Sequence, residues 1–146
     1  MATFAAKDGG RHNERRRKEM TESEKKDIAE KYIKALANRD AALLTSITTE
    51  DIVWRIPGTS LVSGEARGVD AIMKRSETLH RFGVSITLEH VVYGLDDVGL
   101  QHRNAGKHDG KVLDEHITTV CHLRGRKIHH LETFLSDVNM VNDYFV

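Results

Sequence analysis

The chain of 146 residues contains one cysteine, no excess of either charge and no hydrophobic run long enough to cross a membrane. Cys121 alone cannot form an internal disulfide, and its strand-like surroundings predict a small, packed apolar side chain. The 22 lysines and arginines balance 22 aspartates and glutamates, so no overall electric field favours nucleic acid or an anionic membrane as a partner. The N-terminus also lacks the apolar core of a secretory signal, which predicts a cytoplasmic protein.

The first 19 residues form a segment with many basic and few apolar side chains. We expect residues 1–19 to be a disordered basic tail and residues 20–146 to be one domain. The tail is interpreted either as an arm that binds nucleic acid or as a solvated segment. An early start codon, with Met20 as the natural start, would also give a segment without a function. We favour the solvated segment, because the rest of the chain is neutral.

Helical patterns dominate the first half of the domain. Thr21 and Glu24 have the spacing of a capping box, and Ile28, Tyr32 and Leu36 recur at every fourth position. These patterns and the cap signals further along predict three helices, over residues 21–37, 41–47 and 70–83.

Strand patterns dominate the second half. Asp109-Gly110 is a turn signal between two alternating segments, so these segments are predicted to form a hairpin. Tyr144 and Phe145, near the end of the chain, are expected to tuck against the sheet. Helices first and consecutive strands last predict an α+β fold, a curved antiparallel sheet with the three N-terminal helices packed on one face. The predicted strands are residues 51–56, 84–93, 98–105, 111–123 and 126–137.

The hairpin carries the candidate catalytic residues. Alternation places His102 and Asn104 on one face of its first strand, and Asp114, His116 and Thr118 on one face of its second. Polar groups on a covered face need partners or a ligand, which predicts a polar-lined pocket. These assignments depend on register, because a slip of one residue turns a strand's side chains to the other face.

Two chemistries fit this set. His116 is the candidate acid or base, with Asp114 about 7 Å away by strand geometry, His102 on the neighbouring strand and Asn104 as a donor to a carbonyl or enolate oxygen. Alternatively, His116 and Asp114 satisfy each other or contact water. The second chemistry is metal binding by two histidines and one carboxylate, His102, His116 and Asp114. No His-x-x-x-His or paired-Cys spacing supports it. We therefore predict neither a metal nor another cofactor.

The order and spacing of several short segments resemble one superfamily. These are residues 35–40 (Ala-Leu-Ala-Asn-Arg-Asp), 49–54 (Thr-Glu-Asp-Ile-Val-Trp), 64–68, 125–128 (Gly-Arg-Lys-Ile), 133–138 (Thr-Phe-Leu-Ser-Asp-Val) and 143–145. Together they resemble the nuclear-transport-factor-2-like superfamily and, within it, the SnoaL-like branch. The resemblance implies a cone whose mouth binds a mainly apolar small molecule, and a homodimer formed through the outer face of the sheet.

The resemblance also implies which residues line the pocket. Besides the five hairpin residues, they are Tyr32, Trp54, Ile56, His129, Leu131 and Thr133. Tyr32 is expected to be a core residue whose hydroxyl reaches the pocket, and Trp54 either stacks on a flat ligand or packs in the core.

Among the branches, the cyclases resemble this chain best, because they use an aspartate and a histidine in a hydrophobic cup. The epoxide-hydrolase branch uses an Asp–Arg–Asp set where this chain has His102, Asn104 and Thr133. We therefore predict a cofactor-free acid–base isomerase, cyclase or dehydratase acting on a hydrophobic carbonyl compound. A non-catalytic binding protein for a hydrophobic small molecule and a dimeric interaction module remain the alternatives.

Overall fold

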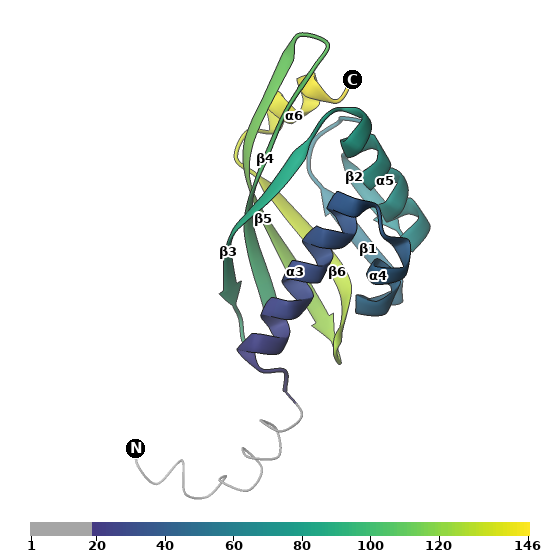
Figure 1. The fold of residues 1–146 in the computed structure, drawn as a ribbon, viewed down its shortest axis with the longest axis vertical. Coiled ribbons are helices and arrows are strands. Elements are labelled where there is room, and N and C mark those ends of the chain that lie inside the picture. The colour runs from purple at the N-terminus through teal and green to yellow at the C-terminus, as the bar shows by residue number, and fades with distance from the viewer. Residues whose placement is uncertain (1–18) are drawn as a thin grey trace, which may run out of the picture.

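The computed structural model describes residues 19–146, so the predicted basic tail lies outside the described residues except for its last one. Three helices lie on one side of a curved sheet of six strands (Figure 1). The predicted α+β fold is confirmed. In chain order the elements are α3 (Glu22–Asn38), α4 (Ala41–Ile47), β1 (Thr48–Ile56), β2 (Gly64–Arg67), α5 (Val69–Arg81), β3 (Ser85–Tyr93), β4 (Asp97–His108), β5 (Lys111–Arg124), β6 (Lys127–Leu135) and α6 (Val138–Tyr144).

The capping box at the start of α3 is present. The Thr21 hydroxyl accepts a hydrogen bond of 3.1 Å from the Glu24 backbone N–H, and the Glu24 carboxylate accepts one of 3.1 Å from the Thr21 N–H. This arrangement satisfies two of the N–H groups that a helix start leaves unpaired. Ile28, Tyr32 and Leu36 are all buried, as their spacing predicted, and α3 packs on the sheet through them.

The strands are arranged in the order β2-β1-β6-β5-β4-β3. Asp109 and Gly110 join β4 to β5 with positive φ at both residues, the backbone that a tight two-residue hairpin turn requires. Every neighbouring pair is antiparallel except β1 and β6, which run parallel. The sheet is therefore mixed, and the parallel pair joins its N-terminal and C-terminal parts.

Two short elements were not predicted. β2 has four residues, of which only Ala66 is buried, so it gives no clear alternation. α6 covers most of residues 138–146, for which no helix or strand was predicted, and its start has a signal in the sequence. The Asp137 side chain accepts a hydrogen bond of 3.0 Å from the Met140 N–H, as an N-cap residue does. Tyr144 and Phe145 are buried, which confirms that the end of the chain tucks into the fold.

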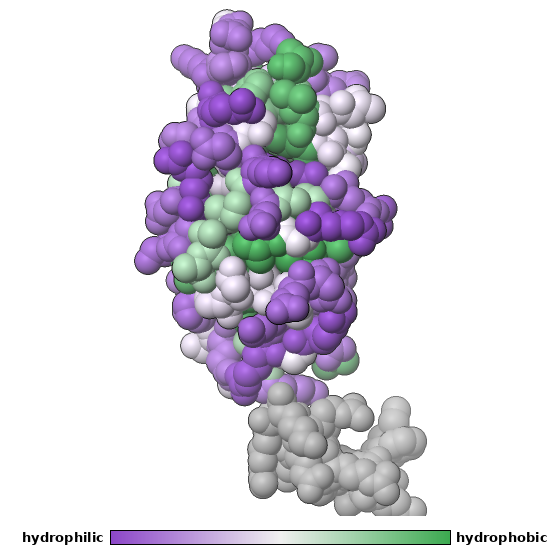
Figure 2. Space-filling view, turned by 90° about the vertical axis from the view of Figure 1, so that its right-hand side faces the viewer, coloured by the Kyte–Doolittle hydropathy of each residue, from purple (hydrophilic) through white to green (hydrophobic). Residues whose placement is uncertain are grey.

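The core lies between the helices and the inner face of the sheet. Cys121 is buried there, as expected. On the side shown in Figure 2 the surface is mostly hydrophilic, and hydrophobic atoms gather in a strip toward the top, the end where Figure 1 places the C-terminus. Among residues 19–146, no helix combines the length and apolar character that crossing a bilayer demands.

Candidate functional site

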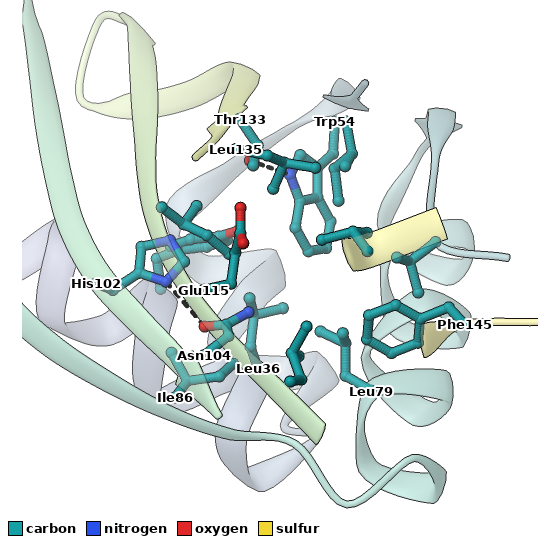
Figure 3. A pocket seen from close by; sticks show the side chains of 16 residues that line it. Leu36, Trp54, Leu79, Ile86, His102, Asn104, Glu115, Thr133, Leu135 and Phe145 are labelled. Carbon is teal, nitrogen blue, oxygen red and sulfur yellow. Dashed lines mark hydrogen bonds between the residues drawn. The ribbon is translucent and has the colours of Figure 1, made fainter. Parts of the chain in front are cut away.

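A pocket lies between the inner face of the sheet and helices α3, α5 and α6 (Figure 3). The pocket is narrow, because the centre of a water molecule can occupy only about 30 Å³ of it. A ligand of more than a few atoms therefore has to displace lining side chains. Most of the lining is apolar, and includes Leu36, Ile56, Leu79, Ile86 and Phe145. Apolar walls with a few polar groups are typical of small-molecule sites.

A continuous chain of hydrogen bonds runs along one wall of the pocket. The Trp54 indole N–H donates to the Thr133 hydroxyl at 2.9 Å, and the hydroxyls of Thr133 and Thr119 are 2.9 Å apart. The Thr119 hydroxyl lies 3.1 Å from Nε2 of His102, whose Nδ1 lies 3.0 Å from Oδ1 of Asn104. All five side chains are buried.

Two further polar groups are buried without a full set of partners. Glu115 and Tyr32 are both 0% exposed and both line the pocket. Oε1 of Glu115 accepts a hydrogen bond from the Asp137 backbone N–H at 2.8 Å. Within the described part of the chain, however, Oε2 of Glu115 and the Tyr32 hydroxyl have no hydrogen-bond partner. Buried polar atoms are nearly always paired, so these two atoms mark where a ligand would bind.

Burial shifts the ionisation of the pocket groups. Desolvation lowers the pKa of His102, although the hydrogen bond with Asn104 and the charge of Glu89 partly oppose this. His102 is therefore uncharged at neutral pH. Desolvation also raises the pKa of Tyr32 well above its ordinary value, with a smaller increase from Cys121 and a decrease from the charge of Arg75. The Tyr32 hydroxyl consequently keeps its proton.

A buried cation lies behind the pocket. The Arg75 guanidinium is 4.9 Å from the centre of the Trp54 ring and donates to the backbone carbonyls of Trp54, Ser63 and Gly64. Among residues 19–146, no carboxylate forms an ion pair with it. Arg75 therefore leaves a net positive charge beside the pocket, and it favours negative charge on a bound molecule.

The predicted face of β4 is correct, whereas the predicted face of β5 is wrong. His102 and Asn104 line the pocket, but Asp114, His116 and Thr118 point to the outer face of the sheet. Directly opposite residues of an antiparallel pair share a face, and His102 is opposite Ile117 while Asn104 is opposite Glu115. The inward side chains of β5 are therefore Leu113, Glu115, Ile117, Thr119 and Cys121.

Asp114 and His116, which were predicted to line the pocket, contact charged side chains on the outer face instead. Asp114 accepts a hydrogen bond of 2.7 Å from Arg103, which lowers the pKa of the Asp114 carboxyl. Nδ1 of His116 lies 3.5 Å from the Glu89 carboxylate, and both side chains are exposed. These residues cannot bind one metal ion together, because the side chain of His102 is on the inner face of the sheet and those of Asp114 and His116 are on the outer face. Among the described residues, no group of three or more His, Cys, Asp or Glu is arranged to hold a metal ion.

Tyr32 on α3, Trp54 and Ile56 on β1 and Thr133 on β6 line the pocket, where they were expected. Leu131 is buried in the core on the same face of β6 as Thr133, outside the pocket lining. The prediction that His129 lines the pocket is wrong, because a register shift between β5 and β6 leaves it beside Arg124, 3.5 Å from the guanidinium.

Sequence reasoning missed three contributors to the site: Glu115, Thr119 and helix α6. A signal for the first two was present, because Leu113, Ile117 and Cys121 are all apolar and share the face of Glu115 and Thr119. Val141 of α6 and Phe145, which follows it, line the pocket.

Comparison with known proteins gives the same picture of the fold. The SnoaL-like domain matches residues 29–131. The uncharacterized protein Rv0034 of Mycobacterium tuberculosis is 29% identical over 122 residues, which cover 81% of this chain and 93% of that protein. The crystal structure of a nuclear-transport-factor-2-like protein from Burkholderia xenovorans aligns with a TM-score of 0.75 and 19% identity, over 87% of this chain and 99% of that one.

The second similar structure is that of a protein co-crystallized with a small molecule. TerC, co-crystallized with polyporic acid, aligns with a TM-score of 0.67 and 13% identity, over 77% of this chain and 92% of that one. At these identities the two structures establish the fold alone. The domain match covers most of the chain, and so this protein belongs to the SnoaL-like family.

Proposed function

We propose that the protein is a cofactor-free acid–base enzyme that moves a proton next to the carbonyl group of a small, mainly apolar compound. The observation that carries this proposal is Oε2 of Glu115, a carboxylate oxygen that lies in an apolar pocket without a hydrogen-bond partner. A carboxylate oxygen without a partner can accept a proton from a ligand bound beside it. Glu115 thus takes the role of base that the sequence suggested for His116 and Asp114.

The remaining polar groups suit the oxygen of the same ligand. Removing a proton beside a carbonyl group places negative charge on the carbonyl oxygen, which donors at fixed positions stabilise. The Tyr32 hydroxyl is protonated, buried and free to donate, and Asn104 presents an amide on the same pocket wall. The buried charge of Arg75 lies close enough to affect Tyr32 and favours the anionic form of the ligand.

His102 is better suited to positioning than to proton transfer. Both of its ring nitrogens already have protein partners, and burial keeps the ring uncharged. The structural similarity to TerC, which was crystallized with polyporic acid, supports the use of this fold to bind a small molecule.

Hydrogen–deuterium exchange tests this proposal without knowledge of the natural substrate. The protein is incubated in deuterium oxide with α-tetralone, a compact apolar ketone, and loss of the α-proton signal is followed by proton NMR. We expect the wild-type protein to accelerate exchange and Glu115→Gln to reduce the acceleration by about 100-fold or more, the usual contribution of a general base. Asp114→Asn is the matched control, since it changes the adjacent carboxylate on the outer face, and should exchange like wild type.

Two results would contradict the proposal. Exchange by Glu115→Gln at the wild-type rate would show that this carboxylate is not the base. Binding of α-tetralone, seen as a raised Tm, without any acceleration of exchange would favour the non-catalytic binding protein.

A further inference from the structure

The hydrogen-bond chain along the pocket wall has a direction, and that direction decides which end of the Asn104 amide faces the ligand. We propose that Trp54, Thr133, Thr119 and His102 together hold Asn104 with its NH₂ group toward the pocket, so that Asn104 selects a carbonyl oxygen over a hydroxyl group. This inference rests on the proposed function only for the assumption that the pocket takes a carbonyl compound.

The direction begins at Trp54. An indole N–H is a donor and has no acceptor atom, so the Thr133 oxygen at 2.9 Å must accept. The single hydroxyl hydrogen of Thr133 is then free to donate to Thr119, whose oxygen is also 2.9 Å away. The opposite direction would leave the hydroxyl hydrogen of Thr133 without an acceptor in a buried site, which is costly.

The same argument passes through His102. Since Thr119 accepts from Thr133, its own hydrogen points to Nε2 of His102, 3.1 Å away. A ring nitrogen that accepts is unprotonated, so in the neutral imidazole the hydrogen is on Nδ1. Nδ1–H then donates to Oδ1 of Asn104 at 3.0 Å. The lowered pKa of His102 fits this uncharged ring.

The last step concerns Asn104. Its oxygen is held by His102, so its nitrogen lies at the other end of the amide group, directed into the pocket in Figure 3. The Asn104 NH₂ group can only donate, and a ketone oxygen can only accept. An alcohol in the same place also needs an acceptor for its own hydrogen, which the Asn104 NH₂ group does not provide, so we expect the ketone to bind about tenfold more tightly.

Nitrogen NMR of the histidine rings reads the direction of the chain without any ligand. At neutral pH the wild-type protein should show His102, assigned by comparison with His102→Gln, with its hydrogen on Nδ1. Thr119→Val removes the donor to Nε2, and we expect the ring to become a mixture of the two tautomers. Thr119→Ser keeps the hydroxyl and should restore the wild-type spectrum, while Thr118→Val, on the outer face, should not alter it.

Binding of two probes tests the consequence for the ligand. Wild type should prefer α-tetralone to the matching alcohol, α-tetralol, about tenfold, and Asn104→Asp, which replaces the donor by an acceptor, should reverse the preference. A wild-type His102 protonated on Nε2, or equal affinities for the two probes, would overturn this inference. In that case, deuterium exchange that depends on Glu115 would still support the proposed function. Conversely, an Nδ1 tautomer and a preference for the ketone without any deuterium exchange would overturn the proposed function but not this inference.

Discussion

The buried carboxylate of Glu115 accepts a hydrogen bond of 2.8 Å from the backbone N–H of Asp137, the residue that caps α6. One oxygen of this side chain therefore holds the start of α6, while the other lies unpartnered in the pocket. Val141 of α6 and Phe145, which follows it, line the same pocket. Glu115 thus connects the proposed chemistry to the segment that forms part of the pocket wall.

Changing Glu115 should separate these two roles. Glu115→Gln keeps an oxygen that accepts from Asp137, so α6 should remain in place while proton transfer is lost. Glu115→Ala leaves that N–H without its acceptor, and we expect a loss of about 1–3 kcal/mol in the free energy of unfolding. Urea unfolding measures this loss. Hydrogen exchange of the α6 backbone amides should also be faster in Glu115→Ala than in Glu115→Gln. Equal exchange in the two variants would show that the hydrogen bond does not hold the helix.

Tyr32 provides a test in which stability and function change in opposite directions. Its hydroxyl is buried without a partner, so Tyr32→Phe removes a polar group that folding had taken out of water without compensation. We expect the free energy of unfolding to stay the same or to rise by up to about 1 kcal/mol. The edge-to-face contact of the ring with Trp54 is kept, because phenylalanine has the same ring.

Deuterium exchange of α-tetralone, by contrast, should become slower in Tyr32→Phe, because a donor to the carbonyl oxygen is lost. Urea unfolding and the exchange rate are measured on the same preparation. A marked loss of stability would indicate that the hydroxyl has a partner in solution, and an unchanged exchange rate would remove Tyr32 from the proposed mechanism.

The sequence predicts features that depend on near neighbours. The capping box of Thr21 and Glu24 and the Asp109-Gly110 turn both bring their residues together within a few positions, and both are present. Local patterns also placed the helical face that contains Tyr32. These features depend on backbone geometry that a short segment determines by itself.

The inward face of β5 was harder to predict, because both of its faces contain apolar and polar side chains. Leu113, Ile117 and Cys121 share the face of Glu115, but only the pairing with β4 places Glu115 opposite Asn104 and buries its carboxylate. Its partner Asp137 is 22 residues away, beyond another strand, and the chain from Trp54 to Thr133 spans 79 residues. Such contacts exist only after the sheet has formed, so a local pattern cannot reveal them.

His102 should make stability depend on pH in a defined direction. Its pKa in the folded protein is lowered, chiefly by burial, while in the unfolded chain it is about 6.5. Above that value the ring is neutral in both states and its contribution to stability is complete. As the pH falls below it, the unfolded chain binds a proton that the folded protein does not, so stability is lost until the pH reaches the folded pKa.

Comparison with His102→Gln isolates this effect from the other histidines, since glutamine does not titrate and the surface groups are common to both proteins. The charge of Glu89 and the hydrogen bond with Asn104 limit the shift, so both must be present in the proteins that are compared. Urea unfolding from pH 7 down to pH 5 should show the wild type losing stability faster than the variant, by at most about 1.4 kcal/mol for each pH unit. A difference that stays constant over this range would mean that His102 is protonated equally easily in the folded and unfolded states, and that burial does not lower the pKa of the ring.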